Sequence, residues 1–360
     1  MTSFTWYMPT RLLFGAGKVA ELATTEHFPW KKALLVVGAG GSTRRSGLLD
    51  RVRGLLAGRG VAVVVYDRIR PNPEAAQVEE AAAIARREGC DVVVGMGGGS
   101  TIDSAKSIAV MARNPGRYWD YMTSGTGGRK VPRDGALPIV AITTTAGTGT
   151  EADPWTVQSN PQTKEKIGWG RDITFPALSI VDPELMTTLP PKQTAYTGMD
   201  AFFHATEAYL ATCHQPGSDL LALEAVSLVA KWLPVAVADG SNIEARTALA
   251  WANTEAGICE SLSSCISHHS LAHAVGAFHP EVAHTPRGIP SVLAPLISEF
   301  KYNDLGSLER ALDARTGQVA AVILDPVSGQ IPQPGFLEGV RDLAHRHGAL
   351  LIFDEIVTGF

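Results

Sequence analysis

Acidic and imidazole side chains at helical spacing are the residues of this chain that most clearly could bind a ligand or take part in a reaction. Asp200 and His204 lie four residues apart, and His269 and His273 repeat that spacing, so each pair would share one helix face. Five of the ten histidines fall between residues 268 and 284. A divalent cation is well held by a carboxylate and several imidazoles from facing helices. The residues alone leave two interpretations open, a metal site or histidines that are solvated or capped.

Two polar turns rich in glycine and threonine each follow an apolar run that is typical of a buried strand. The first turn follows residues 91–95 and opens a helical stretch, and the second follows residues 138–142. Glycine lets the backbone approach a ligand, and the N–H groups of a helix N-terminus favour a phosphate. Both turns would lie at carboxyl ends of strands, so they predict one nucleotide-binding crevice, although such turns also serve as tight connections. The candidate cofactor-binding residues here are Gly97, Gly98, Gly99, Ser100, Asp103, Thr144, Thr145 and Thr148, to which we add Lys166.

The elements that must position these residues change in character along the chain. Short β-branched runs alternate with helical stretches up to residue 191, which predicts an α/β Rossmann-like domain over 1–191. Ala- and Leu-rich helical stretches follow, and they predict an all-α domain over 192–299. Residues 300–360 return to helix, strand, helix, strand and form an α/β tail. The expected strands are 33–37, 61–66, 91–95, 138–142, 178–181, 319–324 and 349–353, and the expected helices are 44–56, 73–87, 102–113, 219–233, 243–260, 305–315 and 334–347.

Composition narrows the classes of function. The net charge is -5 and no block of like charges is present, so neither nucleic acid nor a membrane is an expected partner. We expect no membrane span and no signal peptide, and therefore a cytoplasmic protein. The four cysteines, Cys90, Cys213, Cys259 and Cys265, show no CxxC spacing. They are expected to be small buried residues rather than a disulfide framework or a zinc ribbon.

Several motifs in matching order give the chain a resemblance to the iron-containing alcohol dehydrogenase family over about residues 8–299. The motifs are FGAGKVAEL, PNPEAAQV, GGGSTIDSAK, TTTAGTGTE, IVDPELMTTLPPKQTAYTGMDAFFHATEAY and HSLAHAVGAF. The resemblance implies a dehydroquinate synthase-like architecture, with Fe2+, or Zn2+ as the alternative, held between the two domains. By position it implies that Asp200, His204 and His269 are metal ligands, and that His273 lies beside substrate and nicotinamide without binding the metal. It implies a fourth ligand at His284, with His279 as the fallback.

The end of the first expected strand bears on the choice of cofactor. NAD-binding folds commonly carry a carboxylate after the second strand that accepts from the ribose 2′-OH and repels a 2′-phosphate. Many members of the family that this chain resembles have aspartate where this chain has Gly38. Because Gly38 is uncharged and Ser42, Arg44 and Arg45 follow, the segment favours NADP, with NAD the alternative. The arginines could instead simply begin a solvated helix.

The tail resembles a different family. Residues 302–360 look like an internal piece of a class III pyridoxal-phosphate-dependent aminotransferase, in which Asp354 matches the carboxylate that pairs with the pyridinium nitrogen. The Schiff-base lysine of that family lies beyond the end of the resemblance, so aminotransferase activity is not expected. The chain then reads as a chimera joined near residues 299–302, with an incomplete helical domain.

These observations together predict a metal-dependent alcohol dehydrogenase or aldehyde reductase that transfers a hydride between an alcohol and NADP. The expected partners are a small alcohol or aldehyde and a second copy of the chain in a homodimer. Two alternatives remain at this point. One is a dehydroquinate synthase-like or glycerol dehydrogenase-like metal enzyme, and the other is an inactive or misassembled chimera.

Overall fold

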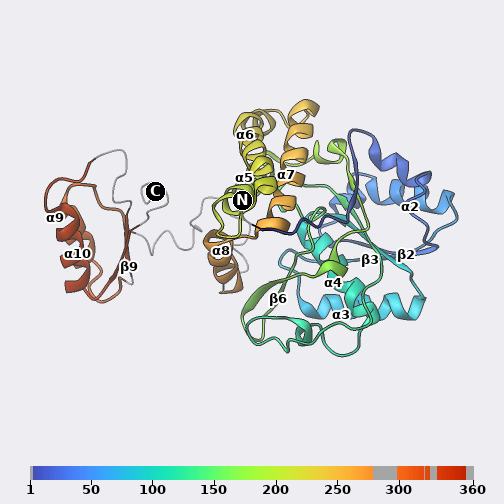
Figure 1. Cartoon of the computed structure of the whole chain (residues 1–360), viewed down its shortest axis with the longest axis horizontal. Helices are drawn as coiled ribbons and strands as arrows, with labels where there is room; N and C mark the ends of the chain where they lie inside the picture. Colours follow the sequence, from blue (N-terminus) through green and yellow to red (C-terminus); the bar gives the residue numbers. More distant parts are fainter. Residues whose placement is uncertain (1–2, 279–297, 320, 325–330, 354–360) are drawn as a thin grey trace. The chain divides into compact units, whose positions relative to one another are not determined.

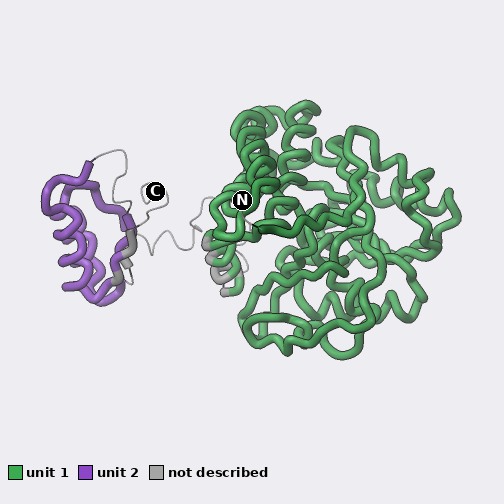
Figure 2. Tube along the Cα trace, viewed as in Figure 1, with its two compact units in different colours: residues 1–286 green, residues 287–360 purple. Residues whose placement is uncertain are grey.

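The computed structural model describes residues 3–278, 298–319, 321–324 and 331–353. His279, His284 and Asp354 lie outside the described residues. The chain divides into two compact units, Met1–Pro286 and Arg287–Phe360, and each is described by itself (Figure 2). Residue 191, where the α/β pattern of the sequence ends, lies inside the first unit.

A six-stranded sheet forms the centre of the first unit, and all its strand pairs are parallel (Figure 1). Five of its strands, β2, β3, β4, β5 and β8, confirm the strands predicted for this unit. The sixth strand, the edge strand β1, was not predicted, because its sequence RLLF begins with an exposed arginine and contains no β-branched residue. In spatial order the strands are β1 (Arg11–Phe14), β8 (Leu178–Val181), β5 (Ile139–Thr143), β4 (Val92–Gly97), β2 (Lys32–Gly38) and β3 (Ala62–Ile69).

Helices cover both faces of this sheet, because successive side chains of a strand point to opposite faces. Leu34 and Val36 of β2 pack in one core with α3 (Ala75–Glu88) and α4 (Gly99–Arg113). Leu35 and Val37 pack in the other core with α2 (Leu48–Gly58) and the 3-10 helix η1 (Lys18–Ala23). The fold class is therefore the doubly wound α/β class that the sequence predicts.

Two local predictions for this unit are corrected by the structure. The single helix expected over 44–56 is two helices, α1 (Ser42–Arg45) and α2, because Gly47 adopts φ 76° between them. An antiparallel hairpin, β6 (Thr156–Asn160) and β7 (Glu165–Trp169), has no counterpart in the predicted elements. Its strands TVQSN and EKIGW carry too many polar residues to give the apolar run of a buried strand. Three further 3-10 helices are η2 (Tyr118–Tyr121), η3 (Asp172–Thr174) and η4 (Pro183–Met186).

Four helices follow the sheet in the first unit: α5 (Pro191–Leu210), α6 (Pro216–Ala238), α7 (Ile243–Ser263) and α8 (Ser267–Phe278). Helices α5, α6 and α7 share one core made largely of alanines. By length and composition alone, α6 is apolar enough to cross a membrane. The buried positions of α6, among them Ala222, Ala225 and Val229, recur at the spacing of a helix packed against other helices. That packing accounts for the buried face of α6, whereas Leu220 and Leu223 of the same helix are exposed.

The second unit has a core of its own. It consists of α9 (Leu305–Asp313), β9 (Ala321–Leu324), α10 (Phe336–Arg346) and β10 (Leu350–Phe353), which match the four elements predicted for the tail. The strands β9 and β10 pair in parallel. Leu308, Leu312, Phe336 and Val340 are buried between the helices and this small sheet.

The polar turn after β5 packs directly on α7, backbone against backbone. A Cβ atom added at Gly257 of α7 would lie 2.1 Å from the Gly149 carbonyl oxygen, so only glycine allows this approach. The Asn253 Oδ1 atom accepts hydrogen bonds from the backbone N–H groups of Gly147 and Gly149, the latter at 2.8 Å. The Asn253 Nδ2 atom donates to Glu151 Oε1 at 2.7 Å. Helix α7 therefore fixes the position of the whole turn.

We expect Gly257→Ala to lower the free energy of unfolding by about 1–3 kcal/mol, because the new methyl group overpacks a backbone contact. The measurement is urea denaturation of the full chain. Gly54→Ala on α2 is the matched control, since a Cβ there meets nothing within 4 Å. The control should be neutral or more stable by up to about 1 kcal/mol, as alanine is the better helix former. Equal stability of the two variants would contradict the close packing of α7 on the turn.

Candidate metal and dinucleotide site

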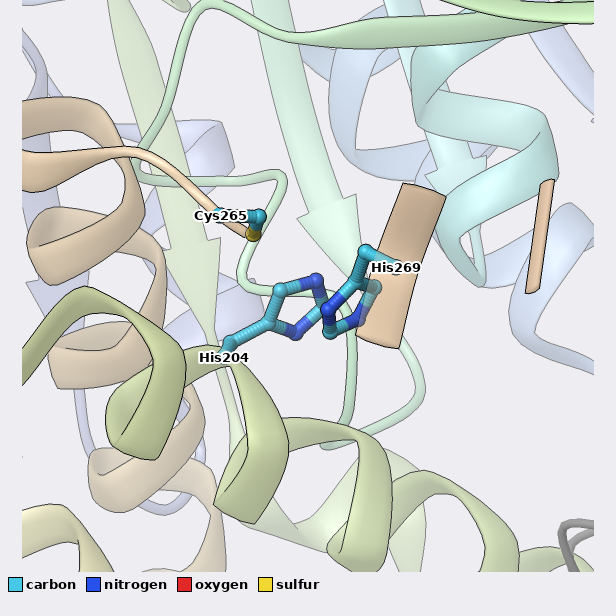
Figure 3. Close-up of side chains that lie close together, drawn as sticks. All are labelled: His204, Cys265 and His269. Atoms are coloured by element: carbon cyan, nitrogen blue, oxygen red, sulfur yellow. The ribbon is translucent and has the colours of Figure 1, made fainter. Parts of the chain in front are cut away.

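Two imidazole rings from different helices stack at one end of the helical part. The rings of His204 on α5 and His269 on α8 have centroids 4.0 Å apart and an interplanar angle of 18°. The Oδ1 atom of Asp200 lies 3.3 Å from His269 Nε2. Among the described residues, His204, His269 and Cys265 each place a metal-binding atom within 4.8 Å of the other two (Figure 3). The structure therefore brings together the three ligands implied by the resemblance, and adds a cysteine.

His204 is held with one ring nitrogen committed to the backbone. Its Nδ1 atom lies 3.2 Å from the Gly147 carbonyl oxygen, which only accepts, so Nδ1 carries the hydrogen and Nε2 has the free lone pair. Burial lowers the pKa of His204 to about 4, so the ring is neutral near pH 7. The Nε2 atom lies 3.5 Å from Glu260 Oε2, and burial raises the pKa of Glu260 to about 7.

His269 lies between two carboxylates, one beside each ring nitrogen. Its Nδ1 atom lies 3.1 Å from Glu207 Oε2, while Nε2 faces Asp200. Burial alone would lower the pKa of His269, but hydrogen bonds with Asp200, Cys265 and Glu207 outweigh burial and raise it to about 12. Glu207 also accepts from the backbone N–H groups of Ile266 at 2.8 Å and His269 at 3.2 Å. Glu207 thus both caps the start of α8 and orients the His269 ring.

The donors fit a divalent cation. In His204 and in His269 the Nδ1 atom is bound to a protein acceptor, which directs Nε2 to the site as in many metal-bound histidines. Two ligands at about 2.0–2.2 Å from a tetrahedral metal lie about 3.4 Å apart. The 3.3 Å between Asp200 Oδ1 and His269 Nε2 matches this separation. The residues present can therefore hold such a cation, after the Nε2 proton of His269 has been released.

His273 and Lys166 lie near this cluster on α8 and β7. A Cβ atom at Gly168 of β7 would lie 3.8 Å from His273 Cε1, so the imidazole ring packs against that strand. Burial and the nearby Lys166 cation lower the pKa of His273 to about 4. Burial also lowers the pKa of Lys166, and its Nζ atom donates to Asn72 Oδ1 at 3.0 Å. The His273 ring is therefore a neutral base near pH 7.

The two polar turns lie side by side, as predicted from their positions at neighbouring strand ends. The backbone N–H of Thr144 donates to the Gly97 carbonyl at 2.9 Å. A Cβ atom at Gly98 would lie 3.2 Å from the Thr145 side chain, and a Cβ atom at Gly99 would lie 2.5 Å from Thr148 Cγ2. The glycines of the first turn are therefore required for contact with the threonines of the second, and Ser100 follows them in the first turn of α4.

Asp103, a candidate cofactor-binding residue, has a carboxylate that is bonded to other groups of the protein. It is buried on α4, its Oδ1 atom accepts from Thr150 Oγ1 at 2.7 Å, and its Oδ2 atom accepts from the Val157 N–H at 2.9 Å. Both carboxylate oxygens thus bind protein groups. In the described structure Asp103 ties α4 to the chain that leads into the β6–β7 hairpin.

Gly38 lies at the end of β2, and Ser42 is exposed at the start of α1. The Arg44 guanidinium pairs with Asp67 of β3 at 3.1 Å, and Arg45 Nη1 donates to the Gly40 carbonyl at 2.7 Å. Asp67 is a carboxylate near this segment that the sequence analysis missed, because strand pairing and not chain proximity brings it there.

Three other residues near the cluster were missed for different reasons. Glu207 lies three residues after His204 on α5, so helical spacing alone could have placed it on the same face. Glu260 and Cys265 come from α7 and from the loop after it, and no local pattern connects them with α5.

The doubly wound sheet followed by a helical domain is the architecture of the iron-type dehydrogenases. The archaeal halo-thermophilic Red Sea brine pool alcohol dehydrogenase superposes with a TM-score of 0.77 and 31% identity, over 97% of this chain and 87% of that one. The family description "Iron-containing alcohol dehydrogenase" matches residues 9–183, and "Fe-containing alcohol dehydrogenase family, C-terminal" matches residues 194–349. The chain therefore belongs to the iron-containing alcohol dehydrogenase family.

Relatives of known name agree with this assignment. Alcohol dehydrogenase 4 of Saccharomyces cerevisiae is 37% identical over 302 residues, which are 83% of this chain and 76% of the relative. The 1,3-propanediol dehydrogenase of Klebsiella pneumoniae is 34% identical over 92% of this chain and 87% of its own length. The C-terminal family match crosses the junction expected near residues 299–302. An aminotransferase origin of the tail, and with it a chimeric chain, stays a prediction from the sequence.

We expect Glu207→Ala to weaken binding of Zn2+ by about 10–100-fold, because His269 loses the acceptor that orients it. The affinity is measured by competition with a chelator of known strength. The control is Glu244→Ala, an exposed carboxylate on α7, which should leave the affinity unchanged. Equal affinities in the two variants would show that Glu207 does not position a metal ligand.

Proposed function

We propose that this protein is a metal-dependent alcohol dehydrogenase or aldehyde reductase that transfers a hydride between an alcohol and NADP. The observation that carries the proposal is the hydrogen bond between His204 Nδ1 and the Gly147 carbonyl. Gly147 belongs to the turn that packs on the glycine-rich turn of the sheet, so a metal ligand and a dinucleotide turn meet at one residue. We further propose that the chain acts in the cytoplasm as a homodimer.

Asp200, His204 and His269 are the proposed ligands within the described residues, and His284 is the fourth candidate. The cation, which we take to be Fe2+ with Zn2+ as the alternative, supplies a Lewis acid for the substrate oxygen, and the nicotinamide supplies the hydride acceptor or donor. Oxidation of an alcohol also releases the hydroxyl proton. The neutral His273 ring is the group that takes this proton and returns it during aldehyde reduction. The proposed site for the pyrophosphate is the turn at Gly97, Gly98 and Gly99, which packs on Thr145 and Thr148.

His269→Ala tests the metal assignment. The variant lacks the ligand that faces Asp200 and stacks on His204, so we expect loss of both bound metal and alcohol oxidation. Metal per chain is measured on purified protein. His214→Ala is the control, because His214 is an exposed histidine paired with Asp219. Unchanged metal content in the His269 variant would refute the ligand assignment.

The preference for NADP rests on the uncharged Gly38 and the exposed hydroxyl of Ser42. Asp67 is the observation that favours NAD, since its carboxylate lies beside Arg44 and would repel a 2′-phosphate. The methanol dehydrogenase of Bacillus methanolicus, 38% identical over 280 residues, is described as NAD-dependent. The arginine that pairs with Asp67 offsets the charge of that carboxylate, and for this reason we favour NADP.

Gly38→Asp is the test of this preference. A Cβ atom at this position lies 3.6 Å from Thr101 Oγ1, an ordinary contact, so the substitution is sterically allowed. The added carboxylate should lower kcat/KM for NADP relative to NAD by about 10–100-fold, through like-charge repulsion of the 2′-phosphate. Gly54→Asp adds the same charge on α2 and should leave the ratio unchanged. Equal kcat/KM values for the two cofactors in the unmodified protein would contradict the preference.

A further inference from the structure

Cys265 lies in the same cluster as the two stacked histidines and differs in this from the other cysteines of the chain. Its Sγ atom is within 4.8 Å of a ring nitrogen of both His204 and His269, and Figure 3 shows the thiol beside the two rings. Cys90 is buried, Cys259 donates from Sγ to the Ser218 carbonyl at 3.2 Å, and Cys213 donates to the Ser263 carbonyl at 2.9 Å. The expectation of small buried residues is therefore confirmed for Cys90 and Cys259, and it is wrong for the half-buried Cys265 and the exposed Cys213.

The backbone on either side of Cys265 is held in place. Ser264 has φ 64° and ψ 170°, a backbone conformation that residues other than glycine rarely adopt. The N–H of Ile266 donates to Glu207 at 2.8 Å. Since Glu207 also holds His269, one carboxylate fixes both the histidine and the short loop that presents the thiol. The thiol is thus placed by the same contacts that place a proposed ligand.

The distances allow the sulfur to reach a cation bound by these histidines. A nitrogen at about 2.0–2.1 Å and a sulfur at about 2.3 Å from a tetrahedral zinc lie about 3.6 Å apart. The separation of at most 4.8 Å therefore requires a shift of about 1.2 Å or less in the loop of three residues between α7 and α8. The two imidazoles and the thiol are three donors in one cluster, and Asp200 Oδ1, 3.3 Å from His269 Nε2, is a fourth donor beside them.

We propose that Cys265 is a metal ligand of this site, additional to Asp200, His204 and His269, and that its thiolate biases the site toward Zn2+. The inference rests on the proposed metal function and refines the choice of cation. Thiolate is a soft ligand that suits zinc, whereas sites of oxygen and imidazole ligands accept iron readily. On binding, the sulfur–metal bond forms and the thiol proton is released to solvent.

Cobalt(II) substitution of the full-length protein tests the proposal directly. A thiolate ligand gives bound Co2+ an intense near-ultraviolet charge-transfer band, which oxygen and nitrogen ligands do not. We expect this band in the unmodified protein and in Cys213→Ser, and its loss in Cys265→Ser. The affinity for Zn2+ should fall at least about 10-fold in Cys265→Ser alone. Circular dichroism establishes that this variant is folded.

A second measurement on the unmodified protein does not depend on a folded variant. Bound Zn2+ should protect Cys265, but not the exposed Cys213, from alkylation, as mapped by mass spectrometry. Bound cobalt without the charge-transfer band, or alkylation of Cys265 at an unchanged rate, would overturn the inference and leave the proposed function standing. Failure of the unmodified protein to bind cobalt or zinc at all would overturn both.

Discussion

The contact between α7 and the turn after β5 is the constraint on which the site depends. Gly149 and Gly257 allow two backbones to touch, and Asn253 satisfies the N–H groups of the turn that this contact removes from water. The same turn packs on the glycines after β4, and its Gly147 carbonyl accepts a hydrogen bond from His204 on α5. One turn therefore contacts both the helices and the carboxyl ends of the strands. A larger side chain at Gly149 or Gly257 would push α7 away from this turn.

The electrostatics of the cluster explain why it suits a cation. With pKa values of about 2 for Asp200 and Glu207 and about 12 for His269, two carboxylates face one imidazolium near neutral pH. His204 stays neutral and Glu260, with a pKa of about 7, adds a further partial negative charge. The local charge is therefore negative around the largely buried His269 and Glu207, where such charge is expensive to maintain. A divalent cation that displaces the His269 proton offsets this negative charge. Because binding releases a proton, the affinity of the site for the cation rises with pH.

Local signals in the sequence account for most of the fold and for part of the site. The buried strands were predictable because parallel strands covered on both faces are continuous apolar runs, and Asp200 with His204 because a helix has a fixed period. The β6–β7 hairpin is polar and the break at Gly47 depends on one dihedral angle, so neither produces a periodic pattern. Cys265 and Glu260 reach the cluster through the path of α7 and its loop, and Asp67 reaches Arg44 through strand pairing. Contacts of this kind are set by tertiary structure and leave no trace in residue spacing.

The hydrogen bond from His204 to Gly147 has a thermodynamic consequence. Any ligand of the dinucleotide turn that moves Gly147 changes the orientation of His204, and any cation that orders His204 restrains the turn. Such a linkage is reciprocal, so the factor by which a cation strengthens nucleotide binding is the factor by which the nucleotide strengthens cation binding. The proposed cation and nucleotide sites would then behave as one cooperative unit, and the occupancy of either would report on the other.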